Sequence, residues 1–225
     1  MPATPYIDIH THRHVSAADI FAVENVFATD IQKFRTEKDR LFSAGIHPWH
    51  INELTLEKDI SSIDEFCADP NVFAIGEAGL DRICKVPFGL QEDVFNCQLE
   101  IAGKHGKPII VHCVKANQEI ISIYRKSKSN SILIFHGFNN NLQIAGKLLD
   151  HGFYLSFGQA LLNQKSNAFR IFKQIPNESI FLETDDSGYS IEEIFAEAAR
   201  IKKISVIDLR KTVYNNFQKC MKGTR

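Results

Sequence analysis

The segment PIIVHC, residues 108–113, is a short apolar run with a histidine near its end. The segments SILIFH (131–136) and SIFLET (179–184) repeat this design and end in a histidine or in acidic and hydroxyl residues. Strands of a parallel sheet are buried on both faces, so they read as nearly continuous apolar runs rather than as alternating ones. The three segments therefore predict buried parallel strands with polar groups at their carboxyl ends.

Apolar and β-branched runs predict eight strands along the chain, and helical patterns lie between most of them. The predicted strands cover residues 6–11, 22–29, 41–46, 72–76, 108–112, 132–136, 153–157 and 180–184. Segment 89–108 places apolar residues at helical spacing and is stopped by Gly106 and Pro108. Ser190 with Glu193, and Ser205 with Asp208, predict the starts of two later helices. The connections 13–21 and 30–40 are short, so any helices there are stunted.

Eight alternations of strand and helix without a linker or repeat favour the α/β class. We predict one compact domain over residues 1–225, a single (β/α)8 TIM barrel with its active site at the C-terminal rim of the strands. An open doubly wound sheet is the alternative, but it would usually carry a glycine-rich phosphate loop, and GEAGLD (76–81) does not match GxGxxG.

Composition excludes several classes of protein. The net charge is −1, so the chain lacks the basic field of a protein that binds nucleic acid by bulk electrostatics. No apolar run is long enough to suggest a transmembrane helix, and nothing in the sequence requires an obligate protein partner. The five cysteines form no CxxC pair. We expect reduced thiols and a cytoplasmic location.

Residues able to bind metal gather at the carboxyl ends of the predicted strands. They are His10 and His12 in YIDIHTH (6–12), His47 in GIHPWH (45–50), Glu77 in AIGEAGLD (74–81), His112, His136 and Asp185. In a (β/α)8 barrel these ends share one rim, where active sites are built. Imidazole and carboxylate ligands suit Zn, Mn, Fe or Co, or Mg where carboxylates and waters dominate.

Six candidate ligands exceed the four that one structural zinc takes, so we predict two divalent metal ions with open positions. The ligands are His10, His12, Glu77, His112, His136 and Asp185, and Glu77 can bridge because a carboxylate has two oxygens. In an extended segment Asp8, His10 and His12 share one face, and we expect Asp8 to lie deeper, as an interior partner.

The remaining roles follow from the chemistry of metal-assisted hydrolysis. Asp185 is the predicted base that takes a proton from the attacking water, in addition to its role as a ligand. His47 is predicted to donate to a substrate phosphate or oxyanion. Lys115 and Arg82 are the predicted substrate contacts, with Lys85 adding to a local basic patch. His14, His50, His105 and His151 are assigned to the surface or to helix ends.

These motifs resemble those of the TatD-related metal-dependent hydrolases, a branch of the amidohydrolase-like barrels. The matching segments are IDIHTH, GIHPWH, IGEAGLD, PIIVHC, FHGF with GFYLSFG, and FLETDD, in the family's order and over nearly the whole chain. The resemblance implies a divalent metal centre, the same six ligands, and His47 as a residue that meets substrate. It also implies deoxyribonuclease activity, often 3′→5′ exonuclease action on single strands, supported by magnesium or manganese.

The chain departs from the family pattern mainly on the substrate side. Arg82 stands where an aromatic residue commonly follows GLD, and Val114 and Lys115 stand where an arginine is common. HGFNN replaces HCFSG, and ETDDSG lacks the usual proline. The sequence therefore leaves three functions open. A phosphodiesterase acting on a single-stranded DNA end is first, a hydrolase of an amide, ester or lactone in a small molecule is second, and a barrel that only binds a partner is third.

Overall fold

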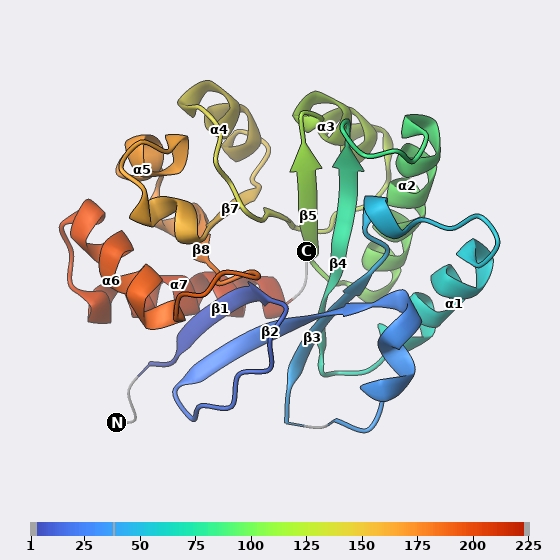
Figure 1. Cartoon of the computed structure of the whole chain (residues 1–225), viewed down its shortest axis with the longest axis horizontal. Helices are drawn as coiled ribbons and strands as arrows, with labels where there is room; N and C mark the ends of the chain where they lie inside the picture. The colour runs from blue at the N-terminus through green and yellow to red at the C-terminus, as the bar shows by residue number, and fades with distance from the viewer. Residues whose placement is uncertain (1–3, 38, 223–225) are drawn as a thin grey trace. The chain divides into compact units, whose positions relative to one another are not determined.

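The computed structural model describes residues 4–37 and 39–222, and its sheet has the strand order that the sequence predicts (Figure 1). Within those residues eight strands form one sheet in chain order, β1 to β8. The pairs β1–β2, β3–β4, β4–β5, β6–β7 and β7–β8 are parallel. Helical segments follow most strands, so the predicted (β/α)8 fold class is confirmed. None of the described helices is both long and apolar enough to cross a membrane.

The strands begin within two residues of the predicted positions; β1 and β7 also end where predicted, and the others end elsewhere. They are β1 (Tyr6–Thr11), β2 (Ile20–Phe27), β3 (Leu41–Gly45), β4 (Val72–Asp81), β5 (Ile109–Val114), β6 (Leu133–Phe135), β7 (Tyr154–Phe157) and β8 (Ile180–Leu182). The helices are α1 (Leu56–Phe66), α2 (Phe88–His105), α3 (Asn117–Lys126), α4 (Leu142–Leu149), α5 (Asn167–Phe172), α6 (Ile191–Lys202) and α7 (Val206–Met221). Short 3-10 turns are η1 (Ala28–Lys33), η2 (Pro48–His50), η3 (Gln159–Leu162) and η4 (Asn177–Ser179).

The described residues divide into two compact units. Unit 1 comprises residues 4–24 and 134–222, and unit 2 comprises residues 25–133 without residue 38. The prediction of a single domain over 1–225 stays a prediction, and residues 1–3, 38 and 223–225 of that range lie outside the described part of the chain.

Unit 1 packs an aromatic core against the helices at the end of the chain. Phe135 meets Phe153 with ring centroids 5.7 Å apart, and Phe157 meets Phe172 at 4.9 Å. Helix α6 starts with the predicted capping box, in which Ser190 accepts from the N–H of Glu193 and the Glu193 side chain accepts from Ser190. The predicted Ser205 cap is present at the start of α7.

Unit 2 is built around β4, which is longer than the sequence predicts. The prediction ends this strand at Gly76, whereas β4 continues to Asp81 and pairs there with Val114 of β5. The buried amide of Gln91, on α2, binds both backbone groups of Asp81 and so supports the added residues. A second buried glutamine of α2, Gln98, binds both backbone groups of Ile46 in the same way. Helix α2 lies beside β4 in Figure 1 and ends at Gly106, in the left-handed conformation.

Strands β4 and β5 approach so closely that one glycine is required between them. Gly79 pairs with His112 and has φ of +153°, a conformation that other residues rarely adopt. A Cβ at this position would lie 1.9 Å from the carbonyl oxygen of His112. The glycine therefore sets the distance between the strand that carries Glu77 and the strand that carries His112.

Replacing Gly79 with alanine should destabilise the protein by about 3 kcal/mol, because the added methyl group meets backbone and the φ angle is strained. Chemical unfolding followed by circular dichroism measures the effect. Gly89→Ala on α2 is the matched control, since nothing lies within 4 Å of a Cβ there. It should change stability by no more than about 1 kcal/mol, in the stabilising direction. Equal effects of the two substitutions would contradict the close approach of β4 and β5.

Candidate metal centre

Four of the predicted ligands come together in unit 1. One ligand atom from each of His10, His136 and Asp185 lies within 4.8 Å of the other two. The Asp185 Oδ1 atom is 3.6 Å from Nε2 of His10 and 3.4 Å from Nε2 of His12. The His10 ring also contacts the His136 ring, with centroids 4.7 Å apart. His10 is fully buried, whereas the side chain of Asp185 is one-third exposed.

The backbone of unit 1 fixes Asp185 against the end of β1. The N–H of Asp185 donates to the carbonyl of His10 at 2.9 Å, and the N–H of His12 donates to the carbonyl of Asp185 at 3.3 Å. Asp185 has a φ of +53°, in the left-handed region that is uncommon for residues other than glycine, asparagine and aspartate. This conformation, held by pairing with β1, places the carboxylate beside the two histidines.

Two buried carboxylates lie beneath this cluster and are held by neutral donors. Asp8 accepts from the N–H of Thr184 at 2.9 Å and from its hydroxyl at 2.6 Å, as expected for an interior partner. Burial raises the pKa of Asp8 to about 7, against the lowering effect of these two bonds. Glu183 accepts from the N–H of Gly137 at 2.6 Å and from the hydroxyl of Ser156.

The other predicted ligands form a second cluster, in unit 2. One ligand atom from each of His47, Glu77 and His112 lies within 4.8 Å of the other two. The Glu77 Oε2 atom is 3.6 Å from Nδ1 of His112 and 3.7 Å from Nε2 of His47. Glu77 is only 5% exposed, and its N–H donates to the side-chain oxygen of Asn25 at 2.8 Å. It lies within β4 rather than at the end of the strand, which corrects the sequence prediction.

Asp81 fixes the orientation and the protonation of His112. Its Oδ2 atom lies 3.1 Å from Nε2 of His112 and accepts from the indole N–H of Trp49 at 2.6 Å. Burial alone would raise the pKa of Asp81, but hydrogen bonds from Ile83, Trp49 and His112 outweigh it and hold the pKa below its usual value. An ionised carboxylate only accepts, so Nε2 of His112 carries a proton, and in the neutral imidazole Nδ1 presents its lone pair towards Glu77.

His47 has the opposite arrangement of donor and acceptor. The backbone N–H of Trp49 donates to Nδ1 of His47 at 3.1 Å, as His47 caps the turn η2. A neutral imidazole with Nδ1 as acceptor carries its proton on Nε2. The nitrogen that faces Glu77 is therefore a donor, and a metal ligand needs a lone pair there. His47 is therefore suited to donate a hydrogen bond rather than to bind metal, and its contact with substrate stays a prediction.

The two clusters fit divalent metal ions by chemistry and by spacing. Imidazole nitrogens and carboxylate oxygens are usual ligands for zinc and related ions. Two ligands about 2.1 Å from a common tetrahedral ion are about 3.4 Å from each other. The pairs that Asp185 makes with His12 and that Glu77 makes with His112 have separations of 3.4 and 3.6 Å, which match this value.

The two predicted basic contacts differ in how they are held. Lys115 is exposed, directly after β5, and has a φ of +53°. Arg82 follows β4, where its guanidinium pairs with Glu119 and lies 4.3 Å from the ring centroid of Phe88. Arg82 is thus held by Glu119 and Phe88, whereas Lys115 is exposed at the end of its strand.

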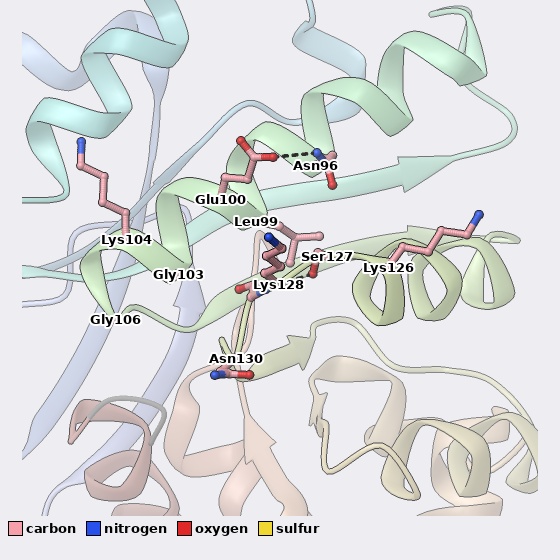
Figure 2. Close-up of a pocket in the computed structure, with 11 residues that line it drawn as sticks. Asn96, Leu99, Glu100, Gly103, Lys104, Gly106, Lys126, Ser127, Lys128 and Asn130 are labelled. Atoms are coloured by element: carbon pink, nitrogen blue, oxygen red, sulfur yellow. Dashed lines mark hydrogen bonds between the residues drawn. The ribbon is translucent and has the colours of Figure 1, made fainter.

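A hollow of about 780 Å³ in unit 2 contains none of the predicted site residues (Figure 2). It lies between the last turns of α2 and the segment after α3, and Lys104, Lys126 and Lys128 are among its lining residues. Lys104 binds the carboxylate of Asp64. Helix α2 ends where the chain turns towards the start of β5, so this hollow adjoins the opposite end of the strand from His112. Lysines near helix C-termini complement the helix dipole, which explains their presence here.

Comparison with known proteins decides the family. The model of the family described as TatD related DNase matches residues 22–222. The chain belongs to the TatD-related DNase family. This match begins after His10 and His12, so those two histidines lie outside the matched residues.

Curated relatives of the family carry the name metal-dependent hydrolase. YabD of Bacillus subtilis is 33% identical over 153 residues, which are 66% of this chain and 60% of YabD. YcfH of Escherichia coli is 27% identical over 198 residues, which are 80% of this chain and 74% of YcfH. The chain thus spans less than two thirds of the first of these relatives. Both relatives are named metal-dependent hydrolases.

Solved structures agree on the fold. The TatD homolog YJJV of Escherichia coli superposes with a TM-score of 0.81 at 19% identity, and the match covers 96% of this chain and 97% of that chain. A TatD family hydrolase of Entamoeba histolytica superposes with a TM-score of 0.76 at 18% identity and covers 97% and 98% of the two chains.

Asp81 and Glu183 are the functional residues that sequence reasoning missed. Glu77 and Asp81 are four residues apart, and alternate residues of a strand share a face. Because the predicted strand stops at Gly76, the sequence did not place Glu77 and Asp81 on one strand. Glu183 is 1% exposed, and its Oε1 atom lies 3.7 Å from Nδ1 of His136. The sequence signal for Glu183 is its place in the apolar run SIFLET. An acidic residue that is buried in such a run must be surrounded by hydrogen-bond donors.

The opposite arrangements of His47 and His112 make a prediction about metal binding. His112→Ala should weaken the binding of Zn²⁺ or Mn²⁺ at least tenfold or remove one equivalent, because a lone-pair donor is lost. His47→Ala should keep the wild-type stoichiometry. Calorimetric titration of the metal-free protein measures both values. Loss of metal in His47→Ala with retention in His112→Ala would show that the two roles are exchanged.

Proposed function

We propose that the protein is a divalent-metal-dependent phosphodiesterase that removes nucleotides from the 3′ end of single-stranded DNA. The family name and the names of the relatives support metal-dependent hydrolysis, and the DNase label supports the substrate. We assign His10, His12, Glu77, His112, His136 and Asp185 as ligands of two divalent ions, with zinc, magnesium and manganese as the candidate metals.

The observation that carries the proposal is the pair formed by Glu77 and His112. Asp81 holds a proton of His112 on Nε2, so Nδ1 of His112 and Oε2 of Glu77, 3.6 Å apart, are the two atoms that we assign as metal ligands. A divalent ion bound by such ligands lowers the pKa of a water and stabilises charge on a phosphoryl group.

Asp185 is the proposed general base. Its carboxylate is partly exposed, so it can reach a water, and its backbone is fixed by pairing with β1. Proton transfer requires the base and the water to lie within hydrogen-bond distance, and a fixed backbone preserves that geometry from one turnover to the next. Asp185 accepts the proton of the attacking water while the bond from phosphorus to the leaving oxygen breaks.

His47 is the proposed donor to the phosphate. The Nε2–H group of His47 points towards the carboxylate of Glu77. The backbone of His47 is held in place by the residues before and after it. Gln98 binds the backbone of Ile46 before it, and Pro48 limits the backbone after it. A donor held in place before substrate arrives stabilises developing negative charge without reorganisation. We assign Lys115 as a phosphate contact and Arg82 as a weaker one, because Arg82 is paired with Glu119.

The near-zero net charge favours action on a strand end. Binding to long duplex DNA relies on many phosphate contacts, and this chain has 26 basic against 27 acidic residues. A single-stranded end needs only a few contacts to phosphate and base. The free state of all five cysteines supports the proposed cytoplasmic location.

The purified protein with Mn²⁺ or Mg²⁺ should shorten a 5′-labelled single-stranded oligonucleotide stepwise from its 3′ end, as seen on a sequencing gel. Asp185→Asn should lower kcat by about 10²–10⁴-fold, because the base is lost while asparagine tolerates the positive φ. Asp186→Asn, on the next and exposed residue, is the matched control and should retain activity. Chelation of the metal should stop the reaction.

Absence of cleavage by protein shown to contain metal would contradict the nuclease assignment and favour a small-molecule amide, ester or lactone as substrate. Full activity of Asp185→Asn would contradict the assignment of the base. Release of label from the 5′ end would reverse the proposed polarity.

A further inference from the structure

Trp49 is an exposed aromatic residue held beside the unit 2 cluster. It is the only tryptophan in the sequence, and 59% of it is exposed. It lies in the turn η2, two residues after His47. A single exposed apolar residue needs no explanation by itself. The position of Trp49 differs from that of Leu54, which is 94% exposed and lies in the following loop, because the indole is anchored.

Both the backbone and the side chain of Trp49 are fixed to residues of the cluster. The indole N–H donates to Oδ2 of Asp81 at 2.6 Å, and the backbone N–H donates to His47. The ring stands nearly perpendicular to the His47 ring, with centroids 5.0 Å apart, and to the His112 ring, with centroids 5.9 Å apart. The polar edge of the indole is thus turned to buried Asp81, and more than half of the side chain remains in solvent.

We propose that Trp49 is a stacking platform for an unpaired base of the substrate. This inference rests on the proposed nuclease function and adds a binding residue to it. An aromatic ring that is already oriented loses little rotational freedom when a base stacks on it. Stacking tolerates any base, because each has a π face, and so suits an enzyme that removes successive nucleotides.

The location of the ring connects base binding to the reacting phosphate. Trp49 lies within 6 Å of both imidazoles of the cluster, one assigned as phosphate donor and the other as metal ligand. A base stacked on the exposed indole therefore brings the adjoining phosphate of its strand to His47. The neutral indole also provides affinity without basic residues, in agreement with the net charge of −1.

The single tryptophan makes the platform directly observable by intrinsic fluorescence. The probe is a phosphorothioate single-stranded thymidine octamer, titrated into the whole protein with Mg²⁺, and the control probe is an octamer with abasic sites that has the same backbone charge. The thymidine octamer should quench the emission saturably. The abasic octamer should leave the emission nearly unchanged and bind about five- to a hundredfold more weakly.

Substitutions separate stacking from a purely structural role of the indole. Trp49→Ala should weaken binding of the thymidine octamer about five- to a hundredfold, as measured by fluorescence anisotropy of a labelled strand. This variant should bind the thymidine octamer and the abasic octamer equally. Trp49→Phe keeps a ring but loses the bond to Asp81, and it should retain most of the affinity. Leu54→Ala is the matched control on an exposed apolar residue and should bind as the wild type does. Thermal melting of each variant checks folding.

The outcomes distinguish this inference from the proposed function. Stepwise cleavage with equal quenching by both probes would overturn the platform and leave the nuclease intact. Base-dependent quenching without cleavage would support the platform and remove the nuclease assignment. Equal losses in Trp49→Phe and Trp49→Ala would assign the indole to holding Asp81 and overturn stacking.

Discussion

Buried carboxylates are the constraint on which the site depends. Removing an ionised carboxylate from water is unfavourable by several kcal/mol unless donors surround it. Asp8, Asp81 and Glu183 are each no more than 1% exposed. Each is held mainly by neutral donors: backbone N–H groups, hydroxyls or an indole. These donors belong to fixed segments of the backbone, so the carboxylates are held in place. The carboxylates in turn hold the imidazoles beside them in a defined orientation.

In a neutral imidazole, the nitrogen that carries the proton donates a hydrogen bond and the other nitrogen can bind metal. His47 and His112 face the same carboxylate oxygen, yet His47 faces it with Nε2 and His112 with Nδ1. The difference arises from their second partners, since His47 caps a turn and His112 binds Asp81. Fixing one nitrogen of a histidine determines the role of the other, and partners of this kind are usual around metal ligands. The proposed division between metal binding by His112 and substrate binding by His47 thus depends on residues one layer away from the reacting atoms.

The sequence predicts the strands well because they depend on local patterns, and the same patterns bring the proposed ligands to neighbouring positions. Apolar runs such as PIIVHC need burial on both faces, and that leads to a parallel sheet in chain order. The end of β4 could not be predicted, because its last residues depend on the Gln91 side chain ten residues later. For the same reason Asp81 was missed, and Glu77 was placed at the end of a strand instead of within it. The anchoring of Trp49 was also hidden, since its partner Asp81 is 32 residues away.

The central claim is that the clusters in the two units are metal sites rather than satisfied polar groups. X-ray diffraction from crystals grown with Mn²⁺ or Zn²⁺, recorded on either side of the absorption edge of the metal, tests it most directly. We expect anomalous peaks within bonding distance of His10, His136 and Asp185, and of Glu77 and Nδ1 of His112, with His47 making no bond to metal. Fully active crystals without peaks at these residues would contradict the account.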